Sequence, residues 1–512
     1  MNTNFRSAIL SAATGLAVLV PGGMAQSQDA SEPNANVQRL VDSLERRAQA
    51  NEIQTRALAA YEARDYAAAA DLFAEQAVLD PMNFVPHYNL ACARSRLDDL
   101  DAAWMALLRA IETGFIDARQ LARDESLARL REDNRYATLV ERWPRLIEAH
   151  RASNAANTAT WMGSRAQSRT LEALRVELLS SHDATLTDDA VREIERVAAF
   201  IHSIIPELAE PESDTLDSWV VVALPSEDRF LSWSVLTFGP SARATFSQIG
   251  GAYDHDQRRL VAKDLGATLR HEFVHVLHWR DMNRRGIESP IWIQEGLASL
   301  VEDCDVVGQT LWPVPSWRTN IAKRLERSGN LPSIEQLTAL SHERFSASRP
   351  LRQYALARTF FLYLHDRGKL GEWYTQVCST HDADPSGLTA LSQVLGKPLD
   401  EIHADYRAWV RELPMVPESG DDLAVTMGLN LEPGKGDGPV VVGFKDASAR
   451  RETGLRLGDV ITSVNDQSTR DLQELIRELG KSQSGQIVTV TYRRGRLHGR
   501  TDVPLRQREP QP

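Results

Sequence analysis

A repeat of 34 residues restricts the fold of the N-terminal part of this 512-residue chain more than any other sequence feature. Residues of the same kind recur at that spacing, and Pro81 closes the first unit. The paired positions are Asp65 and Asp99, Ala69 and Ala103, Phe73 and Leu107, and Ala77 and Ile111. A period of this length is typical of paired helices that bury their apolar faces by stacking on neighbouring pairs. We therefore expect stacked helices over residues 51–150.

The repeated segment resembles the tetratricopeptide repeat family over about two repeats. The resemblance implies a surface that holds a protein partner, although such a stack can also act as a spacer. Before it, residues 26–50 are predicted to form a polar leader and a helix, because apolar residues recur at helical spacing from Val37 to Leu44. Cys92 falls on a packing face of the repeat, so we interpret it as a core residue rather than a reactive thiol.

Residues 1–25 have the layout of a secretory signal peptide. A cation at Arg6 precedes an apolar run at 8–20, and small residues precede the predicted cleavage site after Ala25. The apolar run is too short for a membrane anchor, since a spanning helix needs about 20 residues. We therefore expect an exported, soluble protein, periplasmic or secreted, with no integral membrane segment in the mature chain.

Charge and cysteine content limit the possible partners and cross-links. The formal net charge of -12 argues against nucleic acid as the main partner, because phosphate binding requires a basic surface. The three cysteines do not form a disulfide framework. A pair between Cys304 and Cys378 is possible, and the sequence does not decide whether it forms.

From about residue 160 the pattern changes to mixed helix and strand. The apolar run at 220–224, bounded by Pro225, predicts a buried strand. The segment SQIGGAYD predicts an edge strand, and its residues 250–253 could pair with an extended substrate backbone. A helix that contains the string HEFVH follows directly.

The HEFVH string places two histidines on one face of that helix. His271 and His275 are one turn apart, whereas the apolar residues around them form a stripe that can face the core. Two imidazoles at this spacing can share one Zn²⁺ at about 2.0–2.1 Å from each nitrogen. Glu272, between them, can accept a proton from the attacking water. The string therefore predicts a hydrolytic zinc site.

A catalytic zinc needs a third protein ligand. His278 is on the same face, but it is about 10 Å along the helix axis from His271 and so cannot share the ion. We interpret His278 as a second-shell or groove residue, with a surface histidine as the alternative. Glu295, twenty residues after His275 in SPIWIQEGLASLVED, is the better candidate.

The order of HEFVH and then WIQEGLA at 292–298 strongly resembles the gluzincin metallopeptidases, in particular the bacterial peptidase-MA-like group. The resemblance covers residues 158–413. It implies that both histidines of HEFVH and Glu295 bind zinc and that Glu272 is the general base. The same resemblance implies an α/β metallopeptidase domain over this range.

The resemblance also raises the question of which groups complete the site. Thermolysin-like relatives have an aspartate four positions after the glutamate ligand, but this chain has Ser299. Either another group orients the second histidine, or the comparison with thermolysin fails at this position. In the peptidase-MA-like group a tyrosine in the helix after the glutamate ligand lies near the zinc, and Tyr354 matches it. We expect Tyr354 to donate to the oxyanion, with His342 or His365 in that role if the match is misplaced and a purely structural aromatic as the alternative.

The C-terminal segment at 420–507 follows a linker that contains Pro414 and Pro417. Short strands, one helix and a final strand pair are predicted there. The string ETGLRLGDVITSVND resembles the PDZ family, which binds peptide C-termini by strand addition. Met427, Gly428 and Leu429 match the position of the family's carboxylate-binding loop.

These interpretations together predict a multidomain α+β protein with three parts: α-helical repeats, an α/β gluzincin domain and a small β-rich PDZ domain. The predicted function is zinc-dependent hydrolysis of peptide bonds in a peptide or protein substrate, with recognition by the PDZ domain and the repeats. Two alternatives stay open: a non-catalytic extracytoplasmic adaptor, and zinc hydrolysis of a non-peptide amide.

Overall fold

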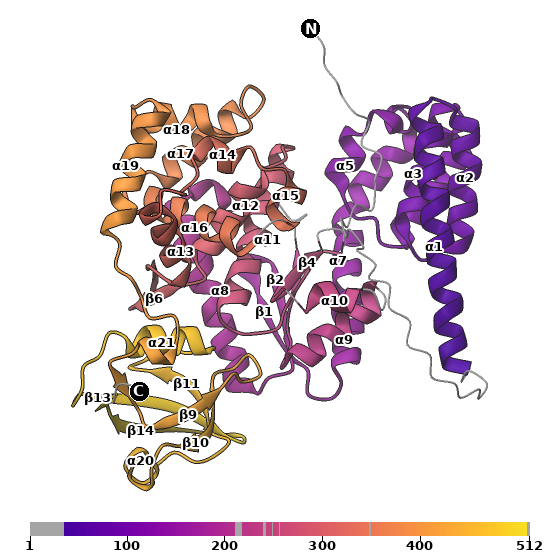
Figure 1. Cartoon of the computed structure of the whole chain (residues 1–512). Coiled ribbons are helices and arrows are strands. Elements are labelled where there is room, and N and C mark those ends of the chain that lie inside the picture. The colour runs from indigo at the N-terminus through magenta and orange to yellow at the C-terminus, as the bar shows by residue number, and fades with distance from the viewer. Residues whose placement is uncertain are drawn as a thin grey trace, which may run out of the picture. The chain divides into compact units, whose positions relative to one another are not determined.

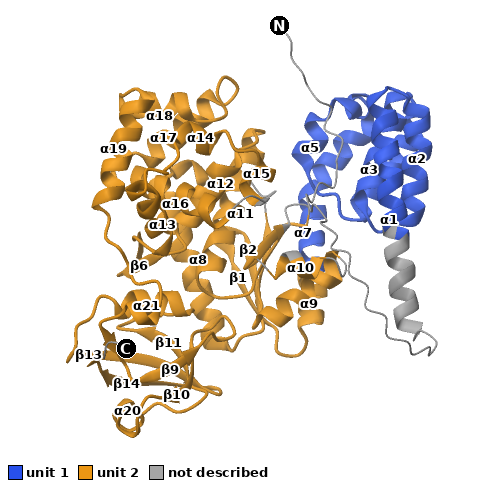
Figure 2. Cartoon of the chain, viewed as in Figure 1, with its two compact units in different colours: residues 1–154 blue, residues 155–512 orange. Residues whose placement is uncertain are grey.

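The chain folds into two compact units, residues 1–154 and 155–512 (Figure 2). This computed structural model describes residues 35–209, 218–238, 242–247, 249–254, 257–347 and 350–508. The predicted signal peptide at 1–25 lies outside the described residues. Among the described helices, none combines the length and the hydropathy needed to cross a bilayer.

The first unit consists of helices (Figure 1). They are α1 (Ala35–Glu62), α2 (Tyr66–Leu79), α3 (Phe84–Arg96), α4 (Leu100–Glu112), α5 (Ala118–Arg123), α6 (Ala128–Arg131) and α7 (Asn134–Met162), whose last residues belong to the second unit. Asp65 and Asp99 each cap a helix, because their side chains accept the N–H groups of Ala68 and Ala102. The repeated apolar residues Phe73 and Leu107 are fully buried. The repeat thus marks helix starts and packing positions.

The second unit contains a five-stranded sheet with the strand order β1-β2-β3-β5-β4. The strands are β1 (Gln167–Leu171), β2 (Val176–Ser180), β3 (Trp219–Ala223), β4 (Gly251–Asp254) and β5 (Arg259–Ala262). The central strands β2, β3 and β5 are parallel, and the two edge strands are antiparallel to them. Side chains of β3 alternate between two apolar clusters, so this strand is buried on both faces, as the apolar run predicted.

Helices cover the sheet and form the larger apolar cluster with it (Figure 1). The helix that carries HEFVH is α11 (Ala267–Arg285), which packs against β4, β5 and α12 (Ile291–Leu300). The other helices and a small hairpin are α8 (Ala184–Ile204), α9 (Glu227–Phe238), α10 (Ala242–Phe246), β6 (Cys304–Val307), β7 (Thr310–Pro313), α13 (Trp317–Arg327), α14 (Ile334–Thr338), α15 (His342–Ala347), α16 (Pro350–Asp366), α17 (Leu370–Thr380), α18 (Leu388–Leu395) and α19 (Leu399–Glu412). Helix α16 packs closely on α12, where a Cβ on Gly296 would lie 2.3 Å from the ring of Phe361.

The C-terminal part has its own sheet, in the order β14-β13-β11-β10-β9. Its elements are β8 (Val425–Thr426), β9 (Leu429–Glu432), β10 (Val440–Phe444), α20 (Ala447–Thr453), β11 (Val460–Val464), β12 (Gln467–Ser468), α21 (Leu472–Leu479), β13 (Ile487–Arg494), β14 (Leu497–Pro504) and β15 (Arg506–Gln507). The predicted helix and the final strand pair are both present. Strand β9 is at the edge of the sheet, directly after the predicted carboxylate loop.

The cysteines do not pair with one another. Cys304 and Cys378 are free, so the disulfide that the sequence left open does not form. Cys304 is buried against the main-chain carbonyls of Leu300 and Val301. Cys92 is buried in the first unit, as its place on a packing face predicted.

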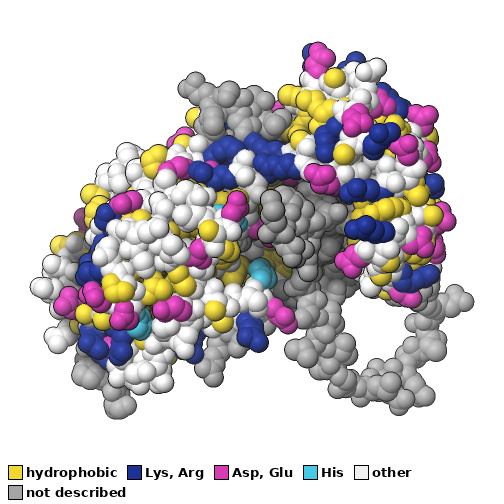
Figure 3. All heavy atoms as spheres, turned by 90° about the horizontal axis from the view of Figure 1, so that it is seen from above, with side chains coloured by type: hydrophobic (Ala, Val, Ile, Leu, Met, Phe, Trp, Pro, Cys, Tyr) yellow, Lys and Arg dark blue, Asp and Glu magenta, His cyan; other side chains and the backbone are white. Residues whose placement is uncertain are grey.

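The surface carries charges of both signs. Figure 3 shows acidic and basic side chains mixed over the visible face of each unit, and neither sign covers a unit alone. The architecture as a whole is multidomain, with mixed helix and sheet, as predicted.

Candidate metal centre

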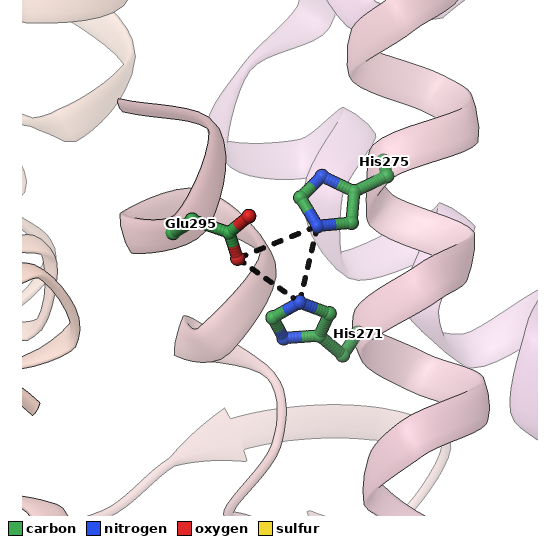
Figure 4. Close-up of side chains that lie close together, drawn as sticks. All are labelled: His271, His275 and Glu295. Carbon is green, nitrogen blue, oxygen red and sulfur yellow. Dashed lines mark hydrogen bonds and ion pairs between the residues drawn. The ribbon is translucent and has the colours of Figure 1, made fainter. Parts of the chain in front are cut away.

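Two histidines of α11 and one glutamate of α12 converge (Figure 4). The Nε2 atoms of His271 and His275 are 3.0 Å apart. Glu295 Oε2 lies 3.2 Å from His271 Nε2 and 3.5 Å from His275 Nε2. The structure therefore brings the three predicted ligands together, with their donor atoms facing one another.

The spacing of these three atoms suits one shared zinc ion. Tetrahedral bonds of about 2.0–2.1 Å place the donor atoms of neighbouring ligands roughly 3.3–3.4 Å apart. The observed distances of 3.0, 3.2 and 3.5 Å are close to that value. Glu295 Oε2 is buried and makes no hydrogen bond among the described residues, although it points at both imidazoles (Figure 4). Two imidazoles and one carboxylate are also the donor types that hydrolytic zinc uses.

The charge state of Glu295 fits a metal ligand. Burial alone would raise its pKa, but His275 and His271 lower it more, so the pKa of Glu295 lies well below its usual range. The side chain is therefore held as the carboxylate, which is the form that binds a metal. The Oγ of Ser299 donates to the main-chain carbonyl of Glu295 and does not orient a histidine.

Glu272 is packed between α11 and the edge strand β4. A Cβ on Gly251 would lie 2.5 Å from Cγ of Glu272, so the strand can pass this close only with glycine at that position. Burial raises the pKa of Glu272, and the two neighbouring histidines oppose this shift. The close approach of β4 confines the Glu272 side chain between the strand and α11.

Glu302 is a site residue that the sequence analysis missed. Its Oε1 lies 2.8 Å from Nδ1 of His271, and its Oε2 accepts Nε of Arg318 at 2.6 Å. Glu302 contacts the first histidine, whereas the sequence led us to expect an orienting group on the second. A signal was present, since Glu302 comes seven residues after Glu295, which is two helical turns along the same face.

We expect Glu302→Gln to weaken zinc binding by about 10–100-fold, because an outer carboxylate fixes the ring of a ligating histidine and raises its basicity. Competition with a chelator measures the dissociation constant. The matched control is Glu343→Gln, since Glu343 is exposed on α15. A zinc affinity within about two-fold of the wild type would show that Glu302 has only a structural role.

Tyr354, near the start of α16, lies beside the cluster. Its ring centre is 6.4 Å from that of His271. Burial first, and then Glu295 and Glu272, raise the pKa of Tyr354. The phenol therefore stays protonated, and its O–H group can donate a hydrogen bond. The two suggested substitutes differ in setting: His342 is exposed, and His365 packs on Phe200 and Trp312. In the described part of the chain, the ring contacts with the cluster favour Tyr354 over them.

A second tyrosine was missed by the sequence analysis. The ring of Tyr253 stacks on His275 with centres 5.0 Å apart and planes 25° apart. Tyr253 is two residues after Gly251 on β4, so both face α11. Its position in the predicted edge strand was the available signal.

His278 lies outside the cluster. Its side chain is buried, with 3% exposed, so the interpretation as a surface histidine is wrong. Burial, with a smaller effect of His275, lowers the pKa of His278 to about 3. Its ring packs against that of Tyr374 at 65° between the planes, which gives His278 a packing role outside the cluster.

The predicted carboxylate loop is a tight turn. Gly428 has φ of +73°, and a Cβ there would lie 2.7 Å from Cβ of Ala449. Its N–H donates to Oγ1 of Thr426 at 3.0 Å. Met427 and Leu429 point into the core of the C-terminal part. Only glycine suits this turn, and the following strand β9 has a free edge.

Comparisons with known proteins identify one part of the chain. Residues 425–505 match the PDZ domain family, so this segment is a PDZ domain. The search of curated proteins found no match to the chain. Among solved structures, an aminopeptidase N family protein from Idiomarina loihiensis is similar at 12% identity, over 67% of this chain and 67% of that chain, with a TM-score of 0.26. A score this low carries no argument about the fold or activity.

Proposed function

We propose that this chain is an exported zinc metallopeptidase of the gluzincin type. The observation that carries the proposal is the convergence of two imidazole nitrogens and one carboxylate oxygen, 3.0–3.5 Å apart, beside the half-buried Glu272. The gluzincin domain at 158–413, the tetratricopeptide-like repeats and export all belong to this proposal. The repeats would hold a protein partner.

The residues at the site divide the chemistry among them. A zinc ion held by His271, His275 and Glu295 would act as a Lewis acid and lower the pKa of a water toward about 7. Glu272 removes the proton of the attacking water and returns it to the leaving amine. Tyr354 donates a hydrogen bond to the oxyanion.

Two further features would support this chemistry. Glu302, itself held by Arg318, keeps His271 in its ring orientation. The free edge of β4 can accept an extended substrate backbone next to Glu272. Substrate and base would then lie on the same side of α11.

Zinc content tests the proposal. We expect about one zinc per chain, because three protein ligands and one open position match hydrolytic zinc. Elemental analysis of protein expressed with zinc provides the number, and cleavage of a mixed peptide library should stop on chelation and return with zinc. A protein without zinc would refute the proposal. Stoichiometric zinc with no peptide cleavage would instead favour the adaptor or a non-peptide amide substrate.

The PDZ domain is proposed to bind peptides with an apolar residue and a free carboxylate at the C-terminus. Met427, Gly428 and Leu429 form the turn from which β9 starts, and β9 offers its edge to an added strand. We expect calorimetry to show at least about ten-fold weaker binding of the amidated peptide, which corresponds to a loss of about 1.4 kcal/mol. Equal affinities would mean that the turn does not receive the carboxylate.

A further inference from the structure

Helix α21 of the PDZ domain forms ion pairs with residues that adjoin the cluster of His271, His275 and Glu295. Its residues Glu474 and Arg477 are three positions apart and therefore share one face, and Lys481 comes two residues after the end of the helix. Each of them has an ion-pair partner outside the PDZ domain. The other face, with Leu475 and Leu479, packs in the PDZ core.

The first connection runs through Arg270, the residue before His271. Its Nη2 contacts Glu474 Oε1 at 2.5 Å, and its Nη1 contacts Glu193 Oε1 at 2.5 Å. The same guanidinium donates to the main-chain oxygen of Glu302 at 2.5 Å. Arg270 is 3% exposed, so these contacts are buried. A buried, multiply bonded guanidinium fixes its partners because loss of one partner is costly.

The second connection holds the segment directly after Glu302. Arg477 donates to Asp303 Oδ1 and to the main-chain oxygen of Cys304, both at 2.9 Å. Glu302 itself contacts His271 Nδ1. Helix α21 is therefore bonded to both supports of His271: the preceding residue of α11 and the segment that presents Glu302.

The same helix shares an apolar cluster with the strand that follows the predicted carboxylate turn. Ile476 of α21 and Leu429 of β9 belong to one apolar cluster, and β9 is the free edge of the sheet. A peptide that adds to β9 would therefore begin beside an apolar cluster to which α21 contributes, while another face of α21 holds Arg270 and the segment after Glu302.

We propose that α21 couples the PDZ peptide site to the His271, His275 and Glu295 cluster, so that peptide binding and zinc binding change each other's affinity. The inference rests on the metal and peptide sites of the proposed function but not on turnover. Coupled affinities without peptide cleavage would therefore support the coupling and contradict the proposed enzyme. Peptide cleavage without coupled affinities would do the reverse. Because coupling between two ligands is reciprocal, each ligand must change the other's affinity by the same factor.

The test measures that factor from both directions. The full-length chain carries Glu272→Gln so that the peptide is not cleaved. A short peptide that ends in valine with a free carboxylate is titrated by calorimetry into metal-free and zinc-loaded protein. Chelator competition gives the zinc affinity with and without the peptide. We expect both ratios to be at least about five-fold and equal.

Variants of α21 locate the coupling. Arg477→Gln removes the contacts with Asp303 and Cys304, so both ratios should fall below about two-fold. Glu474→Gln is a second variant, in which Arg270 keeps Glu193 as counter-ion. Lys481→Gln is the matched control directly after the helix, because Lys481 is 41% exposed and pairs with Asp305, and it should keep the wild-type ratio.

Three outcomes would overturn the inference: no measurable binding of the free-carboxylate peptide, equal peptide affinities with and without zinc, or undiminished coupling in both Arg477→Gln and Glu474→Gln. Melting temperatures of the variants show whether they fold. The peptide affinity of each metal-free variant shows whether its PDZ domain is intact.

Discussion

Glu272→Gln is expected to lower turnover by about 10²–10⁴-fold while the protein keeps about one zinc per chain. The amide has nearly the same shape but cannot accept the proton of the attacking water. Glu272 is packed against Gly251, so the substituted side chain should keep its position. Peptide cleavage gives kcat, and elemental analysis gives the zinc content.

The control for this variant is Glu288→Gln, because Glu288 is exposed in the loop between α11 and α12. Its turnover and zinc content should equal those of the wild type. If Glu272→Gln cleaves within about three-fold of the wild-type rate, another residue is the base. If it loses zinc, the loss of turnover says nothing about proton transfer, and the metal affinity must be restored by excess zinc before kcat is compared.

The convergence of the three candidate ligands was predictable because its information is local. The spacing of His271 and His275 on one helix fixes their separation whatever the rest of the fold is. Glu295 was identified by the order of two short strings, and its helix α12 packs directly on α11. The PDZ elements were predictable for a related reason, since short strands and turn glycines such as Gly428 leave a local pattern.

The residues that were missed depend on tertiary packing. Tyr253 reaches His275 because the β4–β5 hairpin runs beside α11, and no local period encodes that contact. Arg270 and Glu474 are 204 positions apart, so nothing in either segment indicates the pair. Glu302 was partly predictable, because the helical period extends to it from Glu295. However, α12 ends at Leu300, so tertiary packing sets the direction of the Glu302 side chain.

Tyr354→Phe is expected to lower kcat by about 10²–10³-fold, with KM and zinc content near the wild-type values. The substitution removes only the hydroxyl, which would stabilise charge that develops in the transition state and not in the bound substrate. The ring packs on Phe345, with centres 5.3 Å apart, and phenylalanine keeps that contact, so the melting temperature should hardly change.

Tyr253→Phe is the matched comparison, because Tyr253 stacks on His275 whereas the ring of Tyr354 lies near His271. A loss of kcat in Tyr354→Phe alone would assign the oxyanion donor to α16. A loss in Tyr253→Phe alone, with Tyr354→Phe within about three-fold of the wild type, would contradict the prediction and assign the donor to the edge strand. A third outcome is that both single variants lose kcat and the double variant loses no more than either of them. The two phenols would then act as one unit on the same oxygen, since the effects of groups that act together are not additive.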